Sequence, residues 1–218
     1  MTQINKKDML KTYSVNKCEP SFASNNWQQA HCLEDFSYPW ETDKRTNTSF
    51  RALYDDVYFY FHFEVAQAKP ISYVKDNNKM EVVKSERVEL FFAVDPALAT
   101  YYCLEMDAMA RVLDYKASYY REFDFKWQWP KGEIEVVANQ SNSNYVVEGK
   151  ISLQSLRNLA ILKSNEMMVG VYRGECTQLE DTEATLRWIS WVDPKTEKPD
   201  FHVPASFGRF VLADSSDI

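Results

Sequence analysis

The stretch Val57-Tyr58-Phe59-Tyr60-Phe61-His62-Phe63-Glu64-Val65 decides the fold class. Valine and phenylalanine alternate along it with tyrosine, histidine and glutamate at a period of two residues. In a β-strand such alternation puts the apolar side chains on one buried face and the others on the opposite face. The sequence therefore predicts a core strand over residues 57–65.

The same pattern recurs along the chain. Residues 87–94 place Val88, Leu90 and Phe92 on one face. Turn signals such as Asp95-Pro96 separate further candidate strands. These are residues 101–107, 111–116, 133–139, 145–151, 167–173, 186–191 and 209–212. A strand-dominated chain with short connections is the expected result.

Two segments break this rhythm. Residues 153–159 place Leu153 and Leu156 on one helical face, and Ser152 can cap the amino-terminal end. One short helix is expected there. The acidic segment 177–185 is expected to form an exposed loop.

Length and composition favour one domain. The chain has 218 residues, and all-β sandwiches often run to about 200 to 250 residues as one unit. Aromatic residues make up 15% of it, which favours strands, and 45% hydrophobic content suffices for a core. We therefore predict that residues 1–218 form a single antiparallel β-sandwich, jelly-roll-like, with one short helix.

Charge and hydropathy exclude two classes of partner. The formal net charge of -7 lacks the clustered Lys and Arg with which proteins neutralise nucleic-acid phosphates. No stretch approaches the roughly 20 apolar residues of a transmembrane helix. Residues 1–20 carry Lys6, Lys7 and Lys11 without the apolar region of a secretory signal. The expected location is the cytoplasm for the chain as written, or outside it if a leader was removed.

The cysteines indicate no metal site. Cys18, Cys32, Cys103 and Cys176 are scattered, with no C-x-x-C pair and no histidine at zinc-ligand spacing. Two disulfides are conceivable, but free buried thiols are the favoured interpretation at this chain length.

Several stretches, taken in order, resemble the family 9 carbohydrate-binding modules. They are Ala52-Leu53-Tyr54-Asp55-Asp56-Val57-Tyr58-Phe59, Glu86-Arg87-Val88-Glu89-Leu90-Phe91-Phe92, Tyr101-Tyr102 with Leu104-Glu105-Met106-Asp107, and Val146-Val147-Glu148-Gly149-Lys150-Ile151. The most specific is the C-terminal run, where Ile189-Ser190-Trp191-Val192-Asp193-Pro194 leads to Phe201-His202-Val203-Pro204-Ala205-Ser206-Phe207-Gly208. The resemblance covers residues 50 to 212. It implies a sandwich that binds oligosaccharide or polysaccharide without cleaving it.

The resemblance also implies where a sugar binds. In such modules two aromatic side chains sandwich a terminal sugar, and polar groups below them contact its hydroxyls. Phe201 occupies one wall position here, but Val83, which has no π face, occupies the other. Glu89 matches a family glutamate that can accept hydrogen bonds from hydroxyls, whereas Glu105 stands where some members have arginine.

Four more residues are candidate ligands by residue type. Trp127 and Trp129 are two apart in an extended segment, so they could form a stacking platform, or pack under a loop. His202 and Arg173 could donate to sugar hydroxyls, or serve only in local hydrogen bonds and ion pairs.

Calcium is the one cofactor that the resemblance permits. Asp55, Asp56, Glu180 and Asp181 offer the hard oxygen ligands that calcium prefers, although no EF-hand pattern is present. Acidic turns without metal are commoner, so we assign no ligand.

Three other functions remain open from sequence. A glycoside hydrolase would need two carboxylates across a cleft, for which Glu133 and Glu135 are candidates. A haem-binding relative would need an axial ligand, for which His62 is the only faintly suitable histidine. The chain could also be a scaffold or protein-interaction sandwich that has lost sugar binding, as Val83 suggests.

Overall fold

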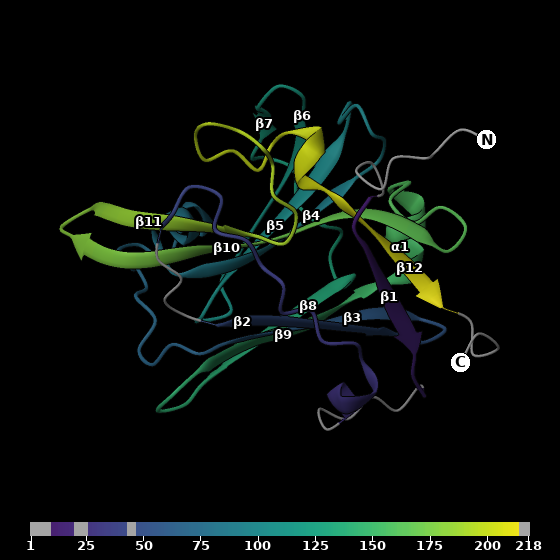
Figure 1. Cartoon of the computed structure of the whole chain (residues 1–218), viewed down its shortest axis with the longest axis horizontal. Coiled ribbons are helices and arrows are strands. Elements are labelled where there is room, and N and C mark those ends of the chain that lie inside the picture. The colour runs from purple at the N-terminus through teal and green to yellow at the C-terminus, as the bar shows by residue number, and fades with distance from the viewer. Residues whose placement is uncertain (1–9, 20–25, 43–46, 214–218) are drawn as a thin grey trace.

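The computed structural model describes residues 10–19, 26–42 and 47–213, and nearly all of its regular structure is β (Figure 1). The strands are β1 (Thr12–Lys17), β2 (Thr48–Tyr54), β3 (Tyr58–Val65), β4 (Arg87–Ala93), β5 (Tyr101–Asp107), β6 (Val112–Ser118), β7 (Glu122–Asp124), β8 (Ile134–Gln140), β9 (Tyr145–Ser152), β10 (Glu166–Glu180), β11 (Glu183–Ser190) and β12 (Gly208–Ala213). The helices are α1 (Leu153–Asn158) and the short 3-10 helices η1 (Asn26–Gln29), η2 (Lys79–Lys84) and η3 (Pro204–Ser206). The all-β prediction is confirmed.

The strands form one continuous curled sheet. Its order is β7-β6-β5-β4-β10-β12-β1-β2-β3-β9-β8, and β11 pairs with β10 outside this path. Its two halves face one another, with β4 to β6 and β10 in one and β2, β3, β8 and β9 in the other (Figure 1). Because the path is unbroken, the structure does not confirm a sandwich of two separate sheets.

The main core lies between the two halves. Phe59, Phe61 and Phe63 enter it from β3, while Leu90 and Phe92 enter it from β4. All five side chains are fully buried. The alternation seen in the sequence therefore marks the strand faces that meet in the core.

The first and last strands lie side by side in the middle of the sheet. β1 pairs in parallel with β12 and with β2, and β12 pairs with β10 in antiparallel fashion. The two parallel pairings of β1 correct the expectation of an entirely antiparallel arrangement. β1 and β12 thereby join the two halves of the curled sheet.

Two local expectations have different outcomes. The short helix is confirmed as α1, and the side chain of Ser152 caps it by accepting a hydrogen bond from the backbone N–H of Ser155. The loop expected over residues 177–185 is wrong, because β10 and β11 continue through it as an antiparallel hairpin. This hairpin projects beyond the sheet (Figure 1), so neither face needs the apolar pattern of a core strand.

The remaining expectations concern thiols and membranes. All four cysteines are free, and three are buried, whereas Cys32 is exposed. Among the described residues, no helix is long and apolar enough to cross a membrane.

Candidate functional site

A second aromatic cluster, here called the outer cluster, covers the face of β4, β5, β6 and β10 that points away from the main core. Its buried members include Phe91, Tyr101, Tyr115, Tyr172, Phe201 and Phe207, and Trp40, Val83, Phe123, Met168 and Trp188 pack against it while half-buried. The segment that follows β11 supplies Phe201 and Phe207, and η2 supplies Val83. Both wall positions implied by the family resemblance thus lie in this cluster.

Three charged side chains are buried beside the outer cluster. The Nε atom of Arg87 lies 2.7 Å from Oε2 of Glu105, to which it donates a hydrogen bond, and 2.8 Å from Oε1 of Glu89. The hydroxyl of Tyr115 donates to Oε1 of Glu105. Oε1 of Glu89 has no hydrogen-bond partner within the described parts of the chain. One guanidinium therefore serves two buried carboxylates.

Two buried carboxylates that share one guanidinium cannot both be fully compensated, and this affects the protonation of Glu89. Burial, and then the charge of nearby Glu105, raise the pKa of Glu89 from 4.5 to about 8, against the opposing effect of Arg87. At neutral pH we expect Glu89 to be a neutral carboxylic acid.

The pH dependence of stability tests this state. Between the ordinary pKa of 4.5 and the folded value of about 8, the folded protein binds a proton that the unfolded chain does not. Binding of this proton stabilises the folded state. The stabilisation is fully present below pH 4.5 and is lost as the pH rises through about 8. We expect Glu89→Gln, which cannot ionise, to lack this loss. Urea unfolding of both proteins between about pH 5 and pH 9 measures it, because the loss falls between 4.5 and about 8. Parallel declines of wild type and variant would contradict a neutral Glu89.

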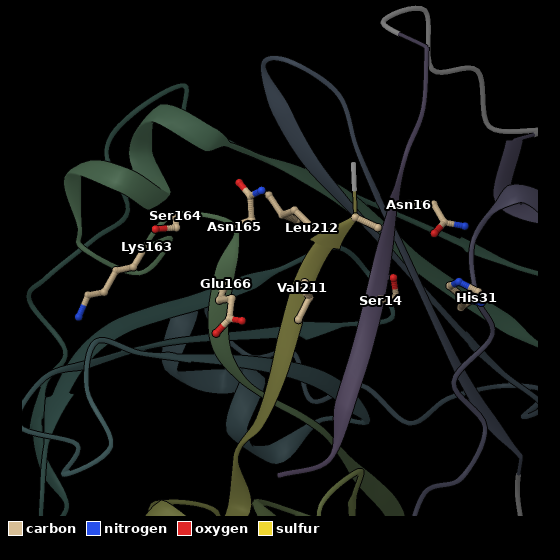
Figure 2. Close-up of a pocket in the computed structure, with 10 residues that line it drawn as sticks. Ser14, Asn16, His31, Lys163, Ser164, Asn165, Glu166, Val211 and Leu212 are labelled. Carbon is tan, nitrogen blue, oxygen red and sulfur yellow. The ribbon is translucent and has the colours of Figure 1, made fainter. Parts of the chain in front are cut away.

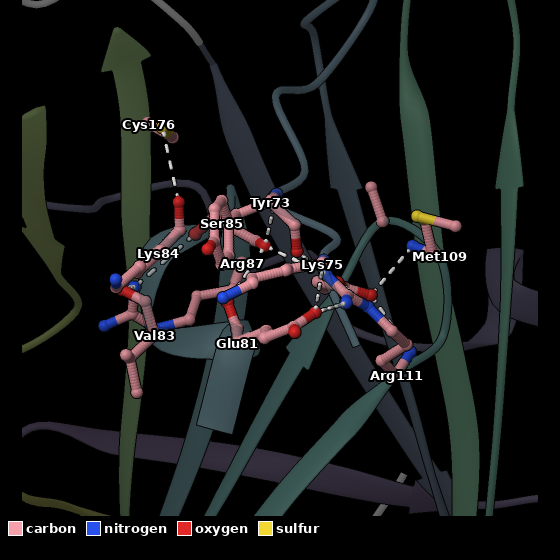
Figure 3. Close-up of polar contacts among 12 residues, drawn as sticks. Tyr73, Lys75, Glu81, Val83, Lys84, Ser85, Arg87, Met109, Arg111 and Cys176 are labelled. Atoms are coloured by element: carbon pink, nitrogen blue, oxygen red, sulfur yellow. Dashed lines mark hydrogen bonds and ion pairs between the residues drawn. The ribbon is translucent and has the colours of Figure 1, made fainter. Parts of the chain in front are cut away.

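The space between the two wall positions is filled by the protein itself. Nη1 of Arg87 donates a 2.9 Å hydrogen bond to the carbonyl oxygen of Val83 (Figure 3). The same guanidinium lies over the ring of Trp188, 5.1 Å from its centroid. Phe201 is only 5% exposed, because Tyr172 stacks on it at 4.1 Å and 9° and Trp188 meets it edge-on. Neither wall position offers a ring face to a sugar.

A polar network holds η2, and with it Val83, against the sheet. Arg111 donates hydrogen bonds to Glu81, to Asp107, to the carbonyl oxygen of Tyr73 and to the hydroxyl of Ser85 (Figure 3). The Glu81 carboxylate also accepts two backbone N–H groups, and these bonds help to lower its pKa. The Val83 side of the filled slot is therefore fixed by charge-assisted bonds.

A small hollow opens beside the filled slot. Its volume is about 80 Å³, and it is lined by Arg121, Trp188, Pro199, Asp200, Phe201 and His202. Asp200 organises its rim by accepting hydrogen bonds from the Tyr120 hydroxyl at 2.6 Å and from Arg121 at 2.9 Å. The hollow therefore combines hydrogen-bonding side chains, Asp200 and Arg121, with the aromatic ring of Trp188.

His202 forms part of the floor of the hollow. Its ring stacks on Phe91 at 5.1 Å, and its Nδ1 atom shares a 3.0 Å hydrogen bond with the Tyr101 hydroxyl. Burial, helped by the positive charge of Arg121, lowers the pKa of His202 to about 3. His202 is therefore a neutral, packed side chain at physiological pH.

Exposed aromatic side chains gather next to this hollow. Among the described residues, the aromatic side chains that rank as exposed are Tyr119, Tyr120 and Phe125, and all lie in one short segment. Half-buried Phe123 lies between them and contacts His202 at 4.9 Å and Phe125 at 5.6 Å. This aromatic segment, residues 119–125, was not singled out from sequence, although its density of Tyr and Phe could have indicated it.

Two residues expected as a stacking platform lie elsewhere. Trp129 is buried in the main core, where its Nε1 donates to the hydroxyl of Ser155 at 2.9 Å. Trp127 packs against Tyr102 and Trp129 on the core side of the sheet. The structure therefore supports the alternative interpretation, packing, for this pair.

Arg173 does not line the hollow either. It is fully buried, and its Nε donates a 2.6 Å hydrogen bond to Oε1 of Glu86. Tyr145 donates to the same carboxylate oxygen, and the backbone N–H of Cys176 donates to the other. Arg173 is thus a structural counter-charge, and no part of its side chain is available to a ligand.

Two of the four acidic residues considered for calcium, Asp55 and Asp56, are engaged in other contacts. Asp55 accepts hydrogen bonds from the backbone N–H groups of Val57 and Tyr58 and from the Tyr60 hydroxyl. Asp56 forms an ion pair with Lys17. In the part of the chain that the structure describes, no group of three or more His, Cys, Asp or Glu could hold a metal ion. Asp55 and Asp56 therefore serve in local contacts, and calcium binding stays a prediction.

Two other candidates are accounted for by local contacts. Nδ1 of His62 lies 3.0 Å from Glu148, and the His62 ring centroid lies 4.8 Å from that of Trp27, so the imidazole is engaged in local contacts. Glu135 is exposed and pairs with Lys150 at 2.8 Å. This pairing supports an ordinary surface role for Glu135.

A wider trough lies across β1, β12 and the start of β10 (Figure 2). Its volume is about 820 Å³, and its lining is mostly polar side chains such as Ser14, Asn16, Asn165 and Glu166. Among the lining residues that the structure describes, none has an aromatic ring other than the imidazole of His31. It lacks the rings on which a sugar would stack.

Comparison with known proteins assigns the family. The family described as "Carbohydrate family 9 binding domain-like" matches residues 22–215. The chain belongs to this family. Family membership agrees with the resemblance of the motifs between residues 50 and 212, and both wall positions of the family lie together in the outer cluster.

Solved structures support the same fold for this family 9 domain. A proposed carbohydrate-binding protein from Bacteroides uniformis ATCC 8492 has a TM-score of 0.72 and 18% identity, covering 94% of this chain and 100% of its own. A family 9 module from Caldicellulosiruptor kristjanssonii, in complex with glucose, has a TM-score of 0.60 and 16% identity, covering 95% and 98%. A family 9 module from the same organism, in complex with cellotriose, has a TM-score of 0.60 and 15% identity, covering 95% of this chain and 97% of its own. A search of curated proteins finds no match.

Proposed function

We propose that this family 9 domain binds oligosaccharide or polysaccharide, without cleaving it, on the face formed by Tyr120, Arg121, Trp188 and Asp200. The observation that carries the proposal is the gathering of the exposed aromatic side chains beside the hollow. Sugar rings present faces of C–H groups that stack on aromatic rings, while their hydroxyls need hydrogen-bond donors and acceptors. The facing halves of the curled sheet also support the proposed sandwich class, with the whole chain as one module.

The polar groups of the face suit hydroxyls. Arg121 is 41% exposed, and its guanidinium has five N–H donors, of which one bonds Asp200. The Asp200 carboxylate accepts from Tyr120, from Arg121 and from the backbone N–H of His202, which leaves acceptor capacity on its second oxygen. Donors and an acceptor are thus held in fixed positions beside Trp188.

The ligands of related structures agree with this proposal. Family 9 modules have been solved with glucose and with cellotriose. The buried carboxylates of Glu89 and Glu105 lie on one side of Arg87 and lack an open cleft between them. Because hydrolysis needs two carboxylates across an accessible cleft, a binding role without cleavage is favoured.

Calorimetric titration with glucose, xylose and mannose oligosaccharides tests the proposal. We expect Tyr120→Ala and Trp188→Ala each to weaken binding by roughly two- to tenfold, the value of one lost aromatic contact. Tyr120→Phe, which keeps the ring but loses the bond to Asp200, should weaken it less. Tyr58, a half-buried tyrosine on β3 in the opposite half, provides the control Tyr58→Ala, which should bind as wild type.

A scaffold without sugar binding is the second candidate. The slot filled by Arg87 and Trp188 favours it, because this is where the family resemblance places the terminal sugar. Wild-type protein that is folded yet binds none of these sugars at millimolar concentration would support the scaffold and contradict the binding proposal.

A further inference from the structure

The shape of this face indicates how a carbohydrate chain would lie on it. The inference rests on the proposed function. A module with an open slot between two aromatic walls can bind the terminal sugar of a carbohydrate chain. Here the wall positions are Val83, which has no ring, and Phe201, whose ring is stacked on Tyr172 and buried. The Arg87 guanidinium and Trp188 occupy the space beside them. No chain end can enter this slot without displacing a buried ion pair.

The neighbouring hollow is small. Its volume is about 80 Å³, and six residues line it. A sugar ring that contacts both Trp188 and the rim formed by Asp200 and Arg121 lies across its mouth. In this position the sugars that precede and follow this ring in the carbohydrate chain both remain outside the hollow.

The aromatic surface continues beyond the hollow in one direction. The His202 ring on its floor meets Phe123, and Phe123 meets Phe125, which also contacts Tyr115 of the outer cluster at 4.9 Å. Phe123 and Phe125 both pack against Tyr115, with ring centroids 5.6 Å and 4.9 Å from it. Phe125 is 37% exposed, although it takes no part in the hollow. A second ring surface is therefore available on the same face.

We propose that the face binds an internal stretch of a carbohydrate chain laid across it, with one sugar at the mouth of the hollow and another stacked on Phe125. Chain ends then make no essential contact. Affinity rises with chain length until both positions are occupied, and modification of either end leaves it unchanged.

Calorimetry with a cello- and a xylo-oligosaccharide series, from monosaccharide to hexasaccharide, tests this arrangement. Each hexasaccharide is also used after borohydride reduction of its reducing end. We expect reduced and unreduced hexasaccharides to bind equally, and the monosaccharide to bind at least tenfold more weakly. Phe125→Ala should weaken hexasaccharide binding by roughly two- to tenfold and leave monosaccharide binding unchanged. Trp188→Ala should weaken both.

The outcomes separate this inference from the proposed function. Loss of binding on end reduction, or a monosaccharide that binds as tightly as the hexasaccharide, would overturn the chain-across arrangement while sugar binding stands. Equal effects of Phe125→Ala on both ligands would also overturn it. If no saccharide binds, the proposed function fails together with this inference.

Discussion

Replacing Arg173 with Met is expected to destabilise the protein by about 3 to 5 kcal/mol, the usual cost of removing one partner of a buried ion pair. Arg173 and Glu86 are both fully buried, and the Nε to Oε1 distance is 2.6 Å. Without the guanidinium, Glu86 keeps the Tyr145 hydroxyl and one backbone N–H as donors but loses its counter-charge. Urea denaturation at neutral pH measures the change.

Two further variants complete the test. Arg209→Met removes a surface pair in which Nη1 of Arg209 lies 3.4 Å from Glu166, and it should cost less than about 1 kcal/mol. The double variant Arg173→Met with Glu86→Gln should recover part of the lost stability, because the buried charge of Glu86 is then removed as well. An Arg173→Met protein as stable as Arg209→Met would show that the buried pair contributes little.

Trp129→Ala is expected to cost about 3 to 5 kcal/mol of stability, the range for deleting a large aromatic side chain from a core. Its ring packs against Phe92 at 5.9 Å and Tyr102 at 6.2 Å, and its indole N–H bonds Ser155. The deletion leaves a cavity in the main core and an unsatisfied hydroxyl. The free energy of unfolding and the sugar affinity are both measured, because the structure predicts a change only in the first.

Phe125→Ala is the matched comparison. Phe125 is 37% exposed and its ring lies 4.9 Å from that of Tyr115, so its loss should cost about 1 kcal/mol, well below the cost of Trp129→Ala. The two variants are therefore expected to show opposite profiles, with stability lost in one and oligosaccharide affinity lost in the other. A Trp129→Ala protein of wild-type stability that no longer binds sugar would restore Trp129 as a ligand residue.

The core strands could be predicted because each has one apolar face. β5 spans the predicted residues 101–107, and β3 and β4 differ from prediction by one residue at one end. Strands β1, β2 and β7 were missed. In β2 the buried positions Phe50 and Ala52 alternate with Ser49 and Arg51, but one small side chain weakens the pattern. β7 has only three residues, too few for any period to show.

The site could be predicted only in part, because the face that carries it is covered by distant segments. Glu89 and Glu105 alternate with apolar residues and therefore look like solvent-facing strand residues in the sequence. Two elements pack over this face, namely η2 and the segment that follows β11, so both carboxylates are buried. Which strand face a later segment covers depends on tertiary packing, which local periodicity does not encode.

The central position of β1 and β12 bears on how the chain folds. β1 fills the space between β12 and β2, and β12 pairs with β10, so the middle of the sheet is built from opposite ends of the sequence. Until both ends arrive, β10 and β2 would each present an unpaired edge, the kind of surface that recruits other chains into aggregates. Pairings between such distant segments also slow folding, because a long loop must close first. A ribosome-bound chain that lacks β12 is accordingly expected to stay open along the line where its two halves later join.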